Sequence, residues 1–503
     1  MTALGPVRRV AVLGGGITGL SAAYYLSKLS AERGEKLEVT VLEGSDRLGG
    51  MVNTLRREGF VIERGPDSFL ARKQPMIDLA LDLGLEDELV GTNPAAKKTY
   101  ISHEDRLLPM PEGMTLGVPT DREKFMRTEL VSESGKLRAF AEIDLPAGEL
   151  PADEPVGLFL ERRMGREMVE RVFEPLLAGI HAGDLYSLGL QATFPQFRSM
   201  VKEQGSLIAG TRESQRVAAE AAQAKAAAKA AGDDAIGHAG GAGESAASNL
   251  PASVFMTFRN GLSSVIEALE EALKEADCVI RLGAQIESLE LNKHTVEGEG
   301  RYRLRLEDGT TLSADDAIVT LPAYAAAGLL APYTDVTALR DIRYVSVANV
   351  VMGYDADGFD HDLDGSGFLV PRKEGRAITA STWTSSKWLH TAPDGKRLVR
   401  CYVGRSGDEA GVEWSDEAIS VAVKRDLREL MGLTAEPKFV EITRLRHSMP
   451  QYPVGHGEAL AAFRAGLAER LPGVLATGAA FGGVGLPDCV AQGKQAAQAL
   501  LAR

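Results

Sequence analysis

Cysteine is scarce in this sequence. Its 503 residues include three cysteines, Cys278, Cys401 and Cys489. They are widely separated, and their spacing matches neither a metal site nor a disulfide framework. The sequence therefore predicts no bound metal ion, and a reducing cytosol is the simplest compartment for such a chain.

An excess of positive charge and long apolar runs are missing as well. Lys and Arg total 56 against 70 Asp and Glu, so the net charge is −14. This balance offers no basic surface for nucleic acid, and an anionic substrate would need locally placed cations. Beyond residues 10–26 no charge-free segment is long enough to span a bilayer, which argues against a membrane-spanning protein but leaves contact with a membrane surface open. The length and the 44% hydrophobic content indicate a globular chain of two or three domains.

Glycine, by contrast, is concentrated near the start, in "VAVLGGGITGLSAAYYL" at residues 10–26. Gly14, Gly16 and Gly19 fit the pattern G-x-G-x-x-G between an apolar strand and a run of helical character. The pattern predicts a strand, a tight turn and a helix whose N-terminus faces a pyrophosphate. A secretion signal would instead be a continuous apolar helix, which each glycine disfavours by roughly 1 kcal/mol.

The next stretch, "LEVTVLEGSDRLGG", carries two further signals of nucleotide binding. Its alternating apolar residues predict a strand that ends in Glu43, where a carboxylate could accept hydrogen bonds from the ribose hydroxyls of adenosine. The alternative for Glu43 is an ordinary solvated carboxylate at a strand end. After it, Arg47-Leu48-Gly49-Gly50 resembles the second glycine pair of flavoproteins with two dinucleotide-binding domains, which lies against FAD. Together these features favour FAD over NAD.

A third glycine-rich turn is expected close to the end of the sequence. The stretch "GVLATGAAFGGVGLPDCVAQGKQAAQALL" predicts a strand that ends at Thr477-Gly478, a turn and a closing helix. Such a turn could serve packing alone. Given the cradle at Gly14, we expect its backbone N–H groups to approach the isoalloxazine or the pyrophosphate.

Between these turns, the sequence predicts a cofactor domain built from separate segments. A helical region is expected where Leu158, Leu160, Met164, Met168, Val172 and Leu176 recur at helical spacing. Short β-branched and aromatic runs between residues 340 and 405 predict a mixed-sheet domain, and the Asp308-Gly309 turn predicts a β-meander that returns to a cofactor-domain strand at 317–321. The predicted segments are 1–75, the first segment of the FAD domain; 76–210, mostly helical with a portion of the substrate domain; 211–251, the insertion; 252–322, the second segment of the FAD domain; 323–440, the substrate domain; and 441–503, the third segment of the FAD domain.

The insertion at 211–251 is rich in Ala and Gly and lacks aromatic residues. It cannot bury enough apolar surface to anchor itself, so we expect a solvated helix followed by a mobile loop, without a catalytic function.

Several ordered motifs, interrupted only by this insertion, resemble those of one family: "GGGITGLSAAYYL", "ERGPDSFLARK", "EPLLAGIHAGD", "ATFPQF", "SMPQYPVGH" and "GVGLPDCVAQGK". The family is the soluble, Gram-positive-type coproporphyrinogen III oxidase, historically called protoporphyrinogen oxidase. The resemblance implies an α/β, FAD-binding Rossmann-like fold of the monoamine-oxidase type, with a mixed-sheet substrate domain and a helical subdomain. It also implies oxidation of coproporphyrinogen III to coproporphyrin III by O₂ in haem biosynthesis, with hydrogen peroxide as by-product. It further suggests that the enzyme is cytoplasmic, that it can lie on membranes and that it contacts a ferrochelatase.

The glycine motifs and the resemblance together single out candidate site residues. In the family a lysine at the position of Lys73 pairs with a substrate carboxylate, and Arg72 stands beside it; the alternative is a solvated surface pair. The predicted cofactor-binding residues are Gly14, Gly15, Gly16, Thr18, Gly19, Glu43, Arg47, Gly49, Gly50, Gly65, Pro66, Asp67, Ile286, Gly478, Val484, Gly485 and Leu486.

No catalytic side chain is predicted, because a bound flavin can take a hydride while the substrate's own pyrrole N–H loses a proton. The protein then needs only to orient the macrocycle and shield the site. His181 could act as a base, but a core or helix-end histidine is the preferred interpretation, and His447 and His456 receive no role. The alternatives to the main hypothesis are a protoporphyrinogen IX oxidase, a flavin amine oxidase and a flavoprotein that only binds a partner.

Overall fold

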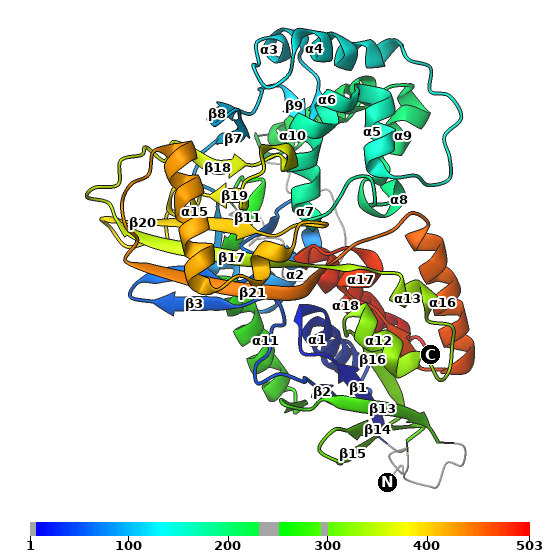
Figure 1. Cartoon of the computed structure of the whole chain (residues 1–503). Helices are drawn as coiled ribbons and strands as arrows, with labels where there is room; N and C mark the ends of the chain where they lie inside the picture. The colour runs from blue at the N-terminus through cyan, green and yellow to red at the C-terminus, as the bar shows by residue number, and fades with distance from the viewer. Residues whose placement is uncertain (1–6, 231–250, 293–299) are drawn as a thin grey trace.

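The computed structural model describes residues 7–230, 251–292 and 300–503. Figure 1 shows a parallel sheet with its helices at the bottom, a larger mixed sheet at the left and a helical region at the top. Segments from both ends of the chain meet in the parallel sheet. The sheet is therefore assembled from strands that lie far apart in the sequence.

The parallel sheet has the strand order β12-β2-β1-β16-β22. Successive residues of its central strand face opposite sides: Val10 and Val12 belong to one apolar core, and Ala11 and Leu13 belong to the other. A strand covered on both faces is expected to be apolar throughout, as this one is. The strands are β1 (Arg8–Leu13), β2 (Leu37–Leu42), β12 (Val279–Arg281), β16 (Asp316–Val319) and β22 (Val474–Ala476).

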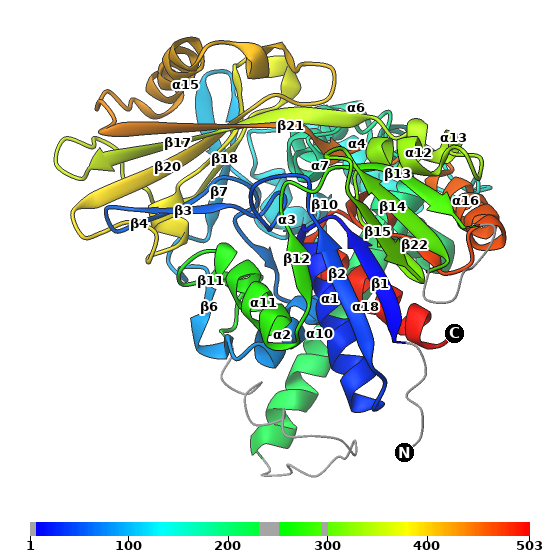
Figure 2. The same ribbon diagram turned by 90° about the horizontal axis from the view of Figure 1, so that it is seen from below.

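Two layers cover this sheet (Figure 2). Residues of α1 (Ile17–Glu32), α2 (Gln74–Asp82), α11 (Ser263–Glu275) and α18 (Leu486–Leu501) share one core with it. The other core contains residues of the antiparallel meander and of a second set of helices. These are β13 (Ile286–Leu291), β14 (Tyr302–Leu306), β15 (Thr311–Ala314), α12 (Ala323–Leu330), α13 (Thr337–Arg340), α16 (His456–Arg470) and α17 (Ala479–Gly482).

The mixed sheet has seven strands in the order β21-β17-β20-β19-β18-β7-β8. Its pairs are antiparallel except for β18 with β7. Helix α15 (Asp416–Met431) packs on it through Ile419, Val423 and Leu427. The strands are β7 (Lys98–His103), β8 (Arg106–Pro109), β17 (Tyr344–Asp355), β18 (Gly365–Leu369), β19 (Ile378–Thr382), β20 (Lys396–Val403) and β21 (Phe439–Pro450); α14 (Thr384–Lys387), η5 (Arg372–Glu374) and η6 (Ala410–Glu413) connect them.

Two domain boundaries differ from the predicted ones. Helices α12 and α13 pack against the parallel sheet, although the predicted substrate domain, which begins at 323, includes them. Strand β21 belongs to the seven-stranded sheet, although the predicted last cofactor segment begins at 441. The chain enters the seven-stranded sheet just before β17 and leaves it after β21, so neither crossing coincides with the predicted boundary.

The helical region forms a core of its own. Leu160, Met164, Met168 and Val172 are buried in it as the spacing predicts, but Leu158 is exposed. The helix is wound as a π-helix over η3 (Val169–Ala178), which contains Pro175; a proline lacks the N–H that a regular α-helix needs. The helices are α3 (Arg122–Met126), α4 (Glu133–Phe140), η2 (Ala141–Asp144), α5 (Val156–Met164), α6 (Arg166–Met168), η3, α7 (Gly179–His181), α8 (Leu190–Thr193), α9 (Pro195–Gln204) and α10 (Leu207–Ala230).

Short strands connect these regions of the molecule. The hairpin of β3 (Thr54–Arg57) and β4 (Phe60–Glu63) leads into the segment that contains Gly65. The remaining elements are the three-stranded sheet of β5 (Phe69–Leu70), β11 (Phe255–Phe258) and β6 (Leu89–Gly91), the pair β9 (Met114–Thr115) and β10 (Val118–Pro119), and η1 (Glu86–Glu88).

The predicted insertion begins inside α10, which starts at Leu207 rather than at 211. Near its start, Arg212 donates to the carbonyl of Thr120 and Gln215 to the hydroxyl of Thr115, so this stretch of the helix is attached to the helical region. The predicted mobile loop falls mainly on residues 231–250, which lie outside the described residues.

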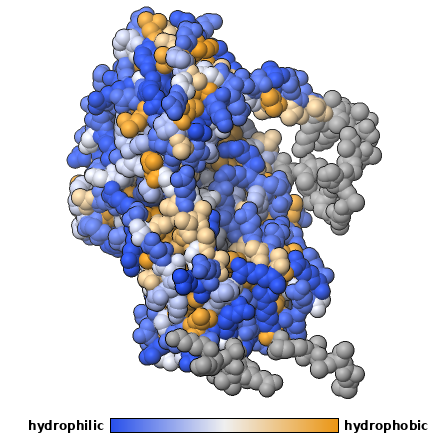
Figure 3. All heavy atoms as spheres, turned by 90° about the vertical axis from the view of Figure 1, so that its right-hand side faces the viewer, coloured by the Kyte–Doolittle hydropathy of each residue, from blue (hydrophilic) through white to orange (hydrophobic). Residues whose placement is uncertain are grey.

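Among the helices that the structure describes, none is long and apolar enough to cross a membrane. On the face shown in Figure 3, hydrophobic side chains are scattered among hydrophilic ones over the described residues.

Candidate functional site

The first glycine turn joins β1 to α1 at the carboxyl end of the parallel sheet. Gly14 has φ +111°, which favours glycine, and its N–H donates to the carbonyl of Leu42. A Cβ on Gly19 would lie 1.9 Å from the carbonyl oxygen of Gly14, so only glycine lets the helix pack this closely on the turn. A Cβ on Gly16 would have one neighbour within 4 Å, the Cα of Gly50 at 3.9 Å. The turn is therefore closed against the sheet and open at Gly16.

The N-terminus of α1 fits the binding of an anion. Its N-cap residue is Gly16, which has no side chain to cap the first turn, and the first turn contains no acidic residue. Thr18 is buried within this turn. The free N–H groups and the positive end of the helix dipole are what the phosphates of a dinucleotide require.

The second glycine pair packs directly on the first turn. Gly49 forms a bridge with Gly16, and its N–H donates to the carbonyl of Gly15. Arg47 holds the loop from its own side: its guanidinium donates to the carbonyls of Leu48, Gly50 and Val52. The structure thus gives Arg47 a local bracing contact.

Glu43 lies at the end of β2, as predicted, with its carboxylate against the first turn. Oε2 accepts from the N–H of Gly15 at 2.7 Å, and Oε1 accepts from the N–H and the hydroxyl of Ser45. The Glu43 backbone carbonyl accepts from Ala284, two residues before Ile286 in β13. The predicted residues Glu43 and Ile286 are therefore brought to the same edge of the sheet.

The C-terminal glycine turn follows β22 and meets α1 at Thr18. Gly478 has φ +123°, and a Cβ placed on it would lie 3.8 Å from the hydroxyl of Thr18. Gly485 is the N-cap of α18, again without a side-chain cap, and Leu486 begins the helix. Val484, the residue before Gly485, is half-buried. The turn places a second uncapped helix N-terminus beside that of α1, since the two helices pack along each other.

Gln492 and Tyr452 hold this turn from within. The Gln492 carbonyl oxygen accepts from the N–H of Gly478 and the hydroxyl of Thr477, and its amide donates to Gly483. Tyr452 donates to the carbonyl of Ala479. Neither residue was singled out from the sequence, because nothing in its local pattern distinguishes it from a packing residue.

The segment Gly65-Pro66-Asp67 reaches the glycine loops through Met51. A Cβ on Gly65 would lie 1.8 Å from the carbonyl oxygen of Met51, which follows Gly50. Asp67 is half-buried between two cations: Lys387 lies 3.5 Å and Arg400 3.8 Å from its carboxylate. Burial alone would raise the pKa of Asp67, but Lys387 and Arg400 outweigh it and hold the pKa well below its usual range.

The two predicted substrate-binding residues, Lys73 and Arg72, differ from each other in their surroundings. The Lys73 ammonium forms an ion pair with Asp488, in the first turn of α18, with Nζ 2.7 and 2.5 Å from the two carboxylate oxygens. Arg72 is exposed. The structure thus places Lys73 beside the C-terminal glycine turn with a carboxylate of the protein as its partner.

His181 lies in the core, as the preferred interpretation expects. Its ring contacts those of Phe194 and Tyr452, and burial lowers the pKa of His181 to about 4. It is therefore neutral near pH 7. The ring of His456 stacks on that of Tyr452, with the ring centroids 4.6 Å apart.

The parallel sheet, the paired glycine loops and two uncapped helix N-termini define a dinucleotide-binding protein of the flavoenzyme class. Comparison with known proteins agrees with this class. Residues 17–501 match the family described as flavin containing amine oxidoreductase. The chain is 40% identical over 489 residues to the coproporphyrinogen III oxidase of Bacillus subtilis, covering 97% of both chains, and 35% identical over 496 residues to that of Staphylococcus aureus, covering 98% of this chain and 99% of the relative. A crystal structure from Exiguobacterium sp. 255-15 superposes with a TM-score of 0.83 at 35% identity and covers 99% of both chains.

The chain belongs to the flavin containing amine oxidoreductase family. FAD is its cofactor, and the predicted fold of the amine-oxidase type is confirmed. The individual cofactor contacts predicted from the sequence remain predictions.

Proposed function

We propose that this protein is an FAD-dependent oxidase that converts coproporphyrinogen III to coproporphyrin III in haem biosynthesis, with O₂ as electron acceptor and hydrogen peroxide as by-product. The observation that carries the proposal is the 40% identity to a coproporphyrinogen III oxidase over 97% of both chains. The glycine loops described above would supply the cofactor site.

The residues of the chain divide the work of binding the cofactor. The N–H groups at the start of α1 would hold the pyrophosphate, and Gly16 leaves the space that it needs. Glu43 would accept hydrogen bonds from the ribose hydroxyls. The N-terminus of α18, whose first turn contains Asp488, would lie at the other end of the site. When bound, FAD supplies the capacity to accept a hydride from carbon and to pass electrons to O₂.

Substrate binding would depend on cations beside this site. The propionates of coproporphyrinogen III need positive partners, and Lys73 and Arg72 remain the proposed ones. Because Lys73 is paired with Asp488, a propionate would have to share or displace that carboxylate. Each two-electron step would remove a hydride from a meso carbon and a proton from the substrate itself, and no catalytic side chain of the protein is proposed for that proton transfer.

The proposed location and partners of the enzyme rest on the same resemblance. We propose that the enzyme acts in the cytoplasm, where a ferrochelatase and the membrane surface are its candidate contacts. The net charge of −14 supports a partner other than nucleic acid.

Anaerobic reduction of the flavin tests the main proposal. Purified holoenzyme should lose its flavin absorbance faster with coproporphyrinogen III than with protoporphyrinogen IX, and it should leave a simple primary amine unreacted. Readmission of O₂ should restore the absorbance and produce hydrogen peroxide together with porphyrin fluorescence. Faster bleaching by protoporphyrinogen IX would reassign the substrate, and bleaching by the amine alone would reassign the enzyme to the amine oxidases. A flavin that no substrate reduces would indicate a protein that only binds a partner.

A further inference from the structure

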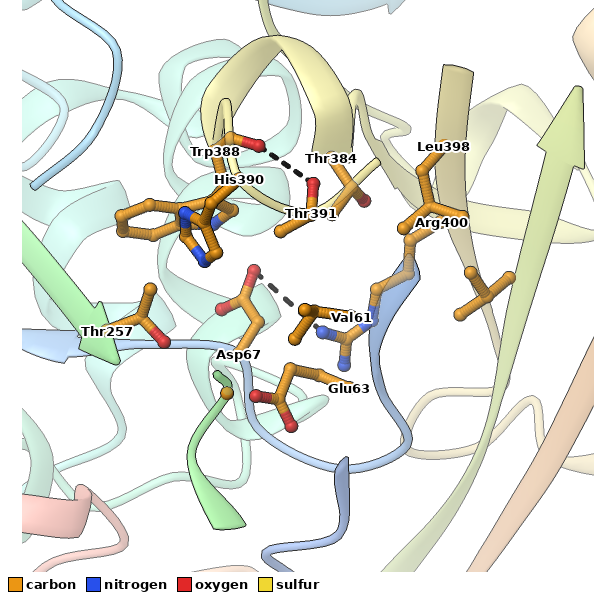
Figure 4. Close-up of a pocket in the computed structure, with 12 residues that line it drawn as sticks. Val61, Glu63, Asp67, Thr257, Thr384, Trp388, His390, Thr391, Leu398 and Arg400 are labelled. Carbon is orange, nitrogen blue, oxygen red and sulfur yellow. Dashed lines mark hydrogen bonds and ion pairs between the residues drawn. The ribbon is translucent and has the colours of Figure 1, made fainter. Parts of the chain in front are cut away.

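Arg400 of β20 extends its guanidinium toward Asp67, in the segment that contains Gly65 (Figure 4). Its side chain is buried. Nε donates to the side-chain oxygen of Asn349 at 2.8 Å, Nη2 donates to the carbonyl of Gly65, and Nη1 lies 3.8 Å from the carboxylate of Asp67. One side chain of the seven-stranded sheet therefore binds both the backbone and the carboxylate of this turn.

Asn349 of β17 adds a second attachment next to the first. Its amide donates to the carbonyl of Glu63 at 2.8 Å while its oxygen accepts from Arg400. The carbonyls of Glu63 and Gly65 are thus held from adjacent strands of one sheet. A planar guanidinium with donors in a fixed fork suits this geometry, and a lysine ammonium cannot reproduce it.

A small cavity of about 20 Å³ borders the same groups, among them Glu63, Asp67 and Trp388. Two buried donors beside it, Nη1 of Arg400 and Nε1 of Trp388, find no hydrogen-bond partner among the residues that the structure describes.

On its other side, the turn touches the cofactor loops. Gly65 packs on the carbonyl of Met51, and Gly50, the residue before Met51, lies against Gly16 at the open side of the first turn. A displacement of Gly65 would therefore shift the loops that are expected to hold the cofactor.

We propose that Arg400, acting through Gly65 and Asp67, is a positioning residue for the flavin: it fixes the cofactor-facing turn to the seven-stranded sheet. This inference rests on the proposed function only in taking FAD as the bound group. Lysine at 400 would keep a positive charge near Asp67 but lose the fork, so the turn would move while the charge balance stayed the same.

The matched control is Arg444 of β21, in the same sheet. It makes the same kinds of contact at a different place: its guanidinium donates to the carbonyls of Val412 and Trp414 and pairs with Asp416. Arg400→Lys and Arg444→Lys therefore remove comparable bonds, and only the first removes them from the turn beside the cofactor.

Four measurements on wild type and both variants test the inference: the Kd of FAD for apoprotein, the visible flavin spectrum, the melting temperature, and kcat and KM per bound flavin with coproporphyrinogen III. We expect Arg400→Lys to raise the Kd and to lower kcat about tenfold each, with a shifted flavin band and little change in KM, because small misplacements near reacting groups have large effects. Arg444→Lys should change these values by less than about twofold and act only on the melting temperature.

Asp67→Asn provides a second variant if Arg400→Lys fails to fold. It should shift the flavin band in the same direction, and where both variants fold their effects should be less than additive, because both act on one turn. The inference is overturned if Arg400→Lys matches Arg444→Lys in Kd, spectrum and kcat, or if the two substitutions at the turn add independently. Should the wild type leave coproporphyrinogen III unoxidised, the substrate proposal would fail while the Kd and the spectrum would still decide the role of Arg400.

Discussion

Lys73 and Asp488 form an ion pair between the residue before α2 and the first turn of α18, with Nζ 2.7 and 2.5 Å from the two carboxylate oxygens. The pair joins a predicted substrate-binding cation to the helix that follows the C-terminal glycine turn. Lys73 could therefore bind a propionate, hold α18, or do both, and substitutions at the two ends separate these roles.

We predict that Lys73→Ala lowers kcat/KM for coproporphyrinogen III about tenfold to hundredfold, since a shielded charge-assisted contact contributes roughly 1.5–3 kcal/mol. The loss should appear mainly in KM, and Lys73→Arg should recover some of it. Protoporphyrinogen IX, which carries fewer propionates, should lose less. Steady-state kinetics on both substrates measure this.

Asp488→Asn is the informative partner variant. It releases Lys73 from its carboxylate, so KM for coproporphyrinogen III should stay level or fall if Lys73 binds a propionate. A rise in KM and in the FAD Kd for both Lys73→Ala and Asp488→Asn would assign the pair to holding α18 instead.

Gly16 and Gly19 should respond differently to substitution. A Cβ on Gly16 meets only the Cα of Gly50 at 3.9 Å, whereas a Cβ on Gly19 would lie 1.9 Å from a carbonyl oxygen. We expect Gly16→Val to fold as an apoprotein with a nearly unchanged melting temperature but little bound FAD, and Gly19→Ala to lose stability in the apoprotein itself. Melting curves of the apoproteins and flavin content after purification provide the test. A Gly16→Val protein with full flavin content would show that the pyrophosphate lies elsewhere.

Glu43→Gln should weaken FAD binding while leaving the fold intact. The glutamine oxygen can still accept from the N–H of Gly15, but its amide loses the bonds from Ser45, and the side chain loses the charge that a ribose hydroxyl would bind. We expect the Kd of FAD to rise about tenfold, which corresponds to about 1.4 kcal/mol. Glu38→Gln, at an exposed position of the same strand, is the control and should leave the Kd unchanged. Equal Kd values for the two variants would return Glu43 to a role in holding the glycine turn.

The free energy of unfolding should depend on pH through the titration of Glu63. Burial raises the pKa of Glu63 from 4.5 to about 7, although Leu262 and Thr54 donate hydrogen bonds to it. Between these values the folded protein binds more protons than the unfolded chain, so the Glu63 contribution to stability falls as pH rises and is lowest above about pH 7. The full effect is at most about 3 kcal/mol.

Glu63→Gln removes this titration. Relative to wild type, its free energy of unfolding should increase between about pH 5 and pH 8, while the exposed control Glu290→Gln should show no such trend. Denaturant unfolding at several pH values measures the difference. A difference between Glu63→Gln and wild type that is constant with pH would mean that Glu63 is already ionised in the folded protein at low pH.

Local sequence was sufficient for the glycine turns and for the strands that lead into them. Gly14 acts through its own backbone angle and Gly19 through its close contact with the carbonyl of Gly14, so the local spacing already predicts the strand, turn and helix that are observed. The position of Glu43 follows in the same way from the length of one strand. The family, too, was predicted correctly from motifs read in order along the chain.

Tertiary structure alone decided which partners the charged residues have. Arg400 binds Gly65 across 335 positions of the chain, and Lys73 binds Asp488 across 415. Neither pairing leaves a trace in local composition, because each depends on how β20 or α18 packs in the finished fold. The same holds for the domain boundaries, where β21 continues one sheet after the predicted boundary. Periodicity determines which residues form a strand or helix, whereas the burial of their faces against distant segments determines which sheet they join and which charges meet.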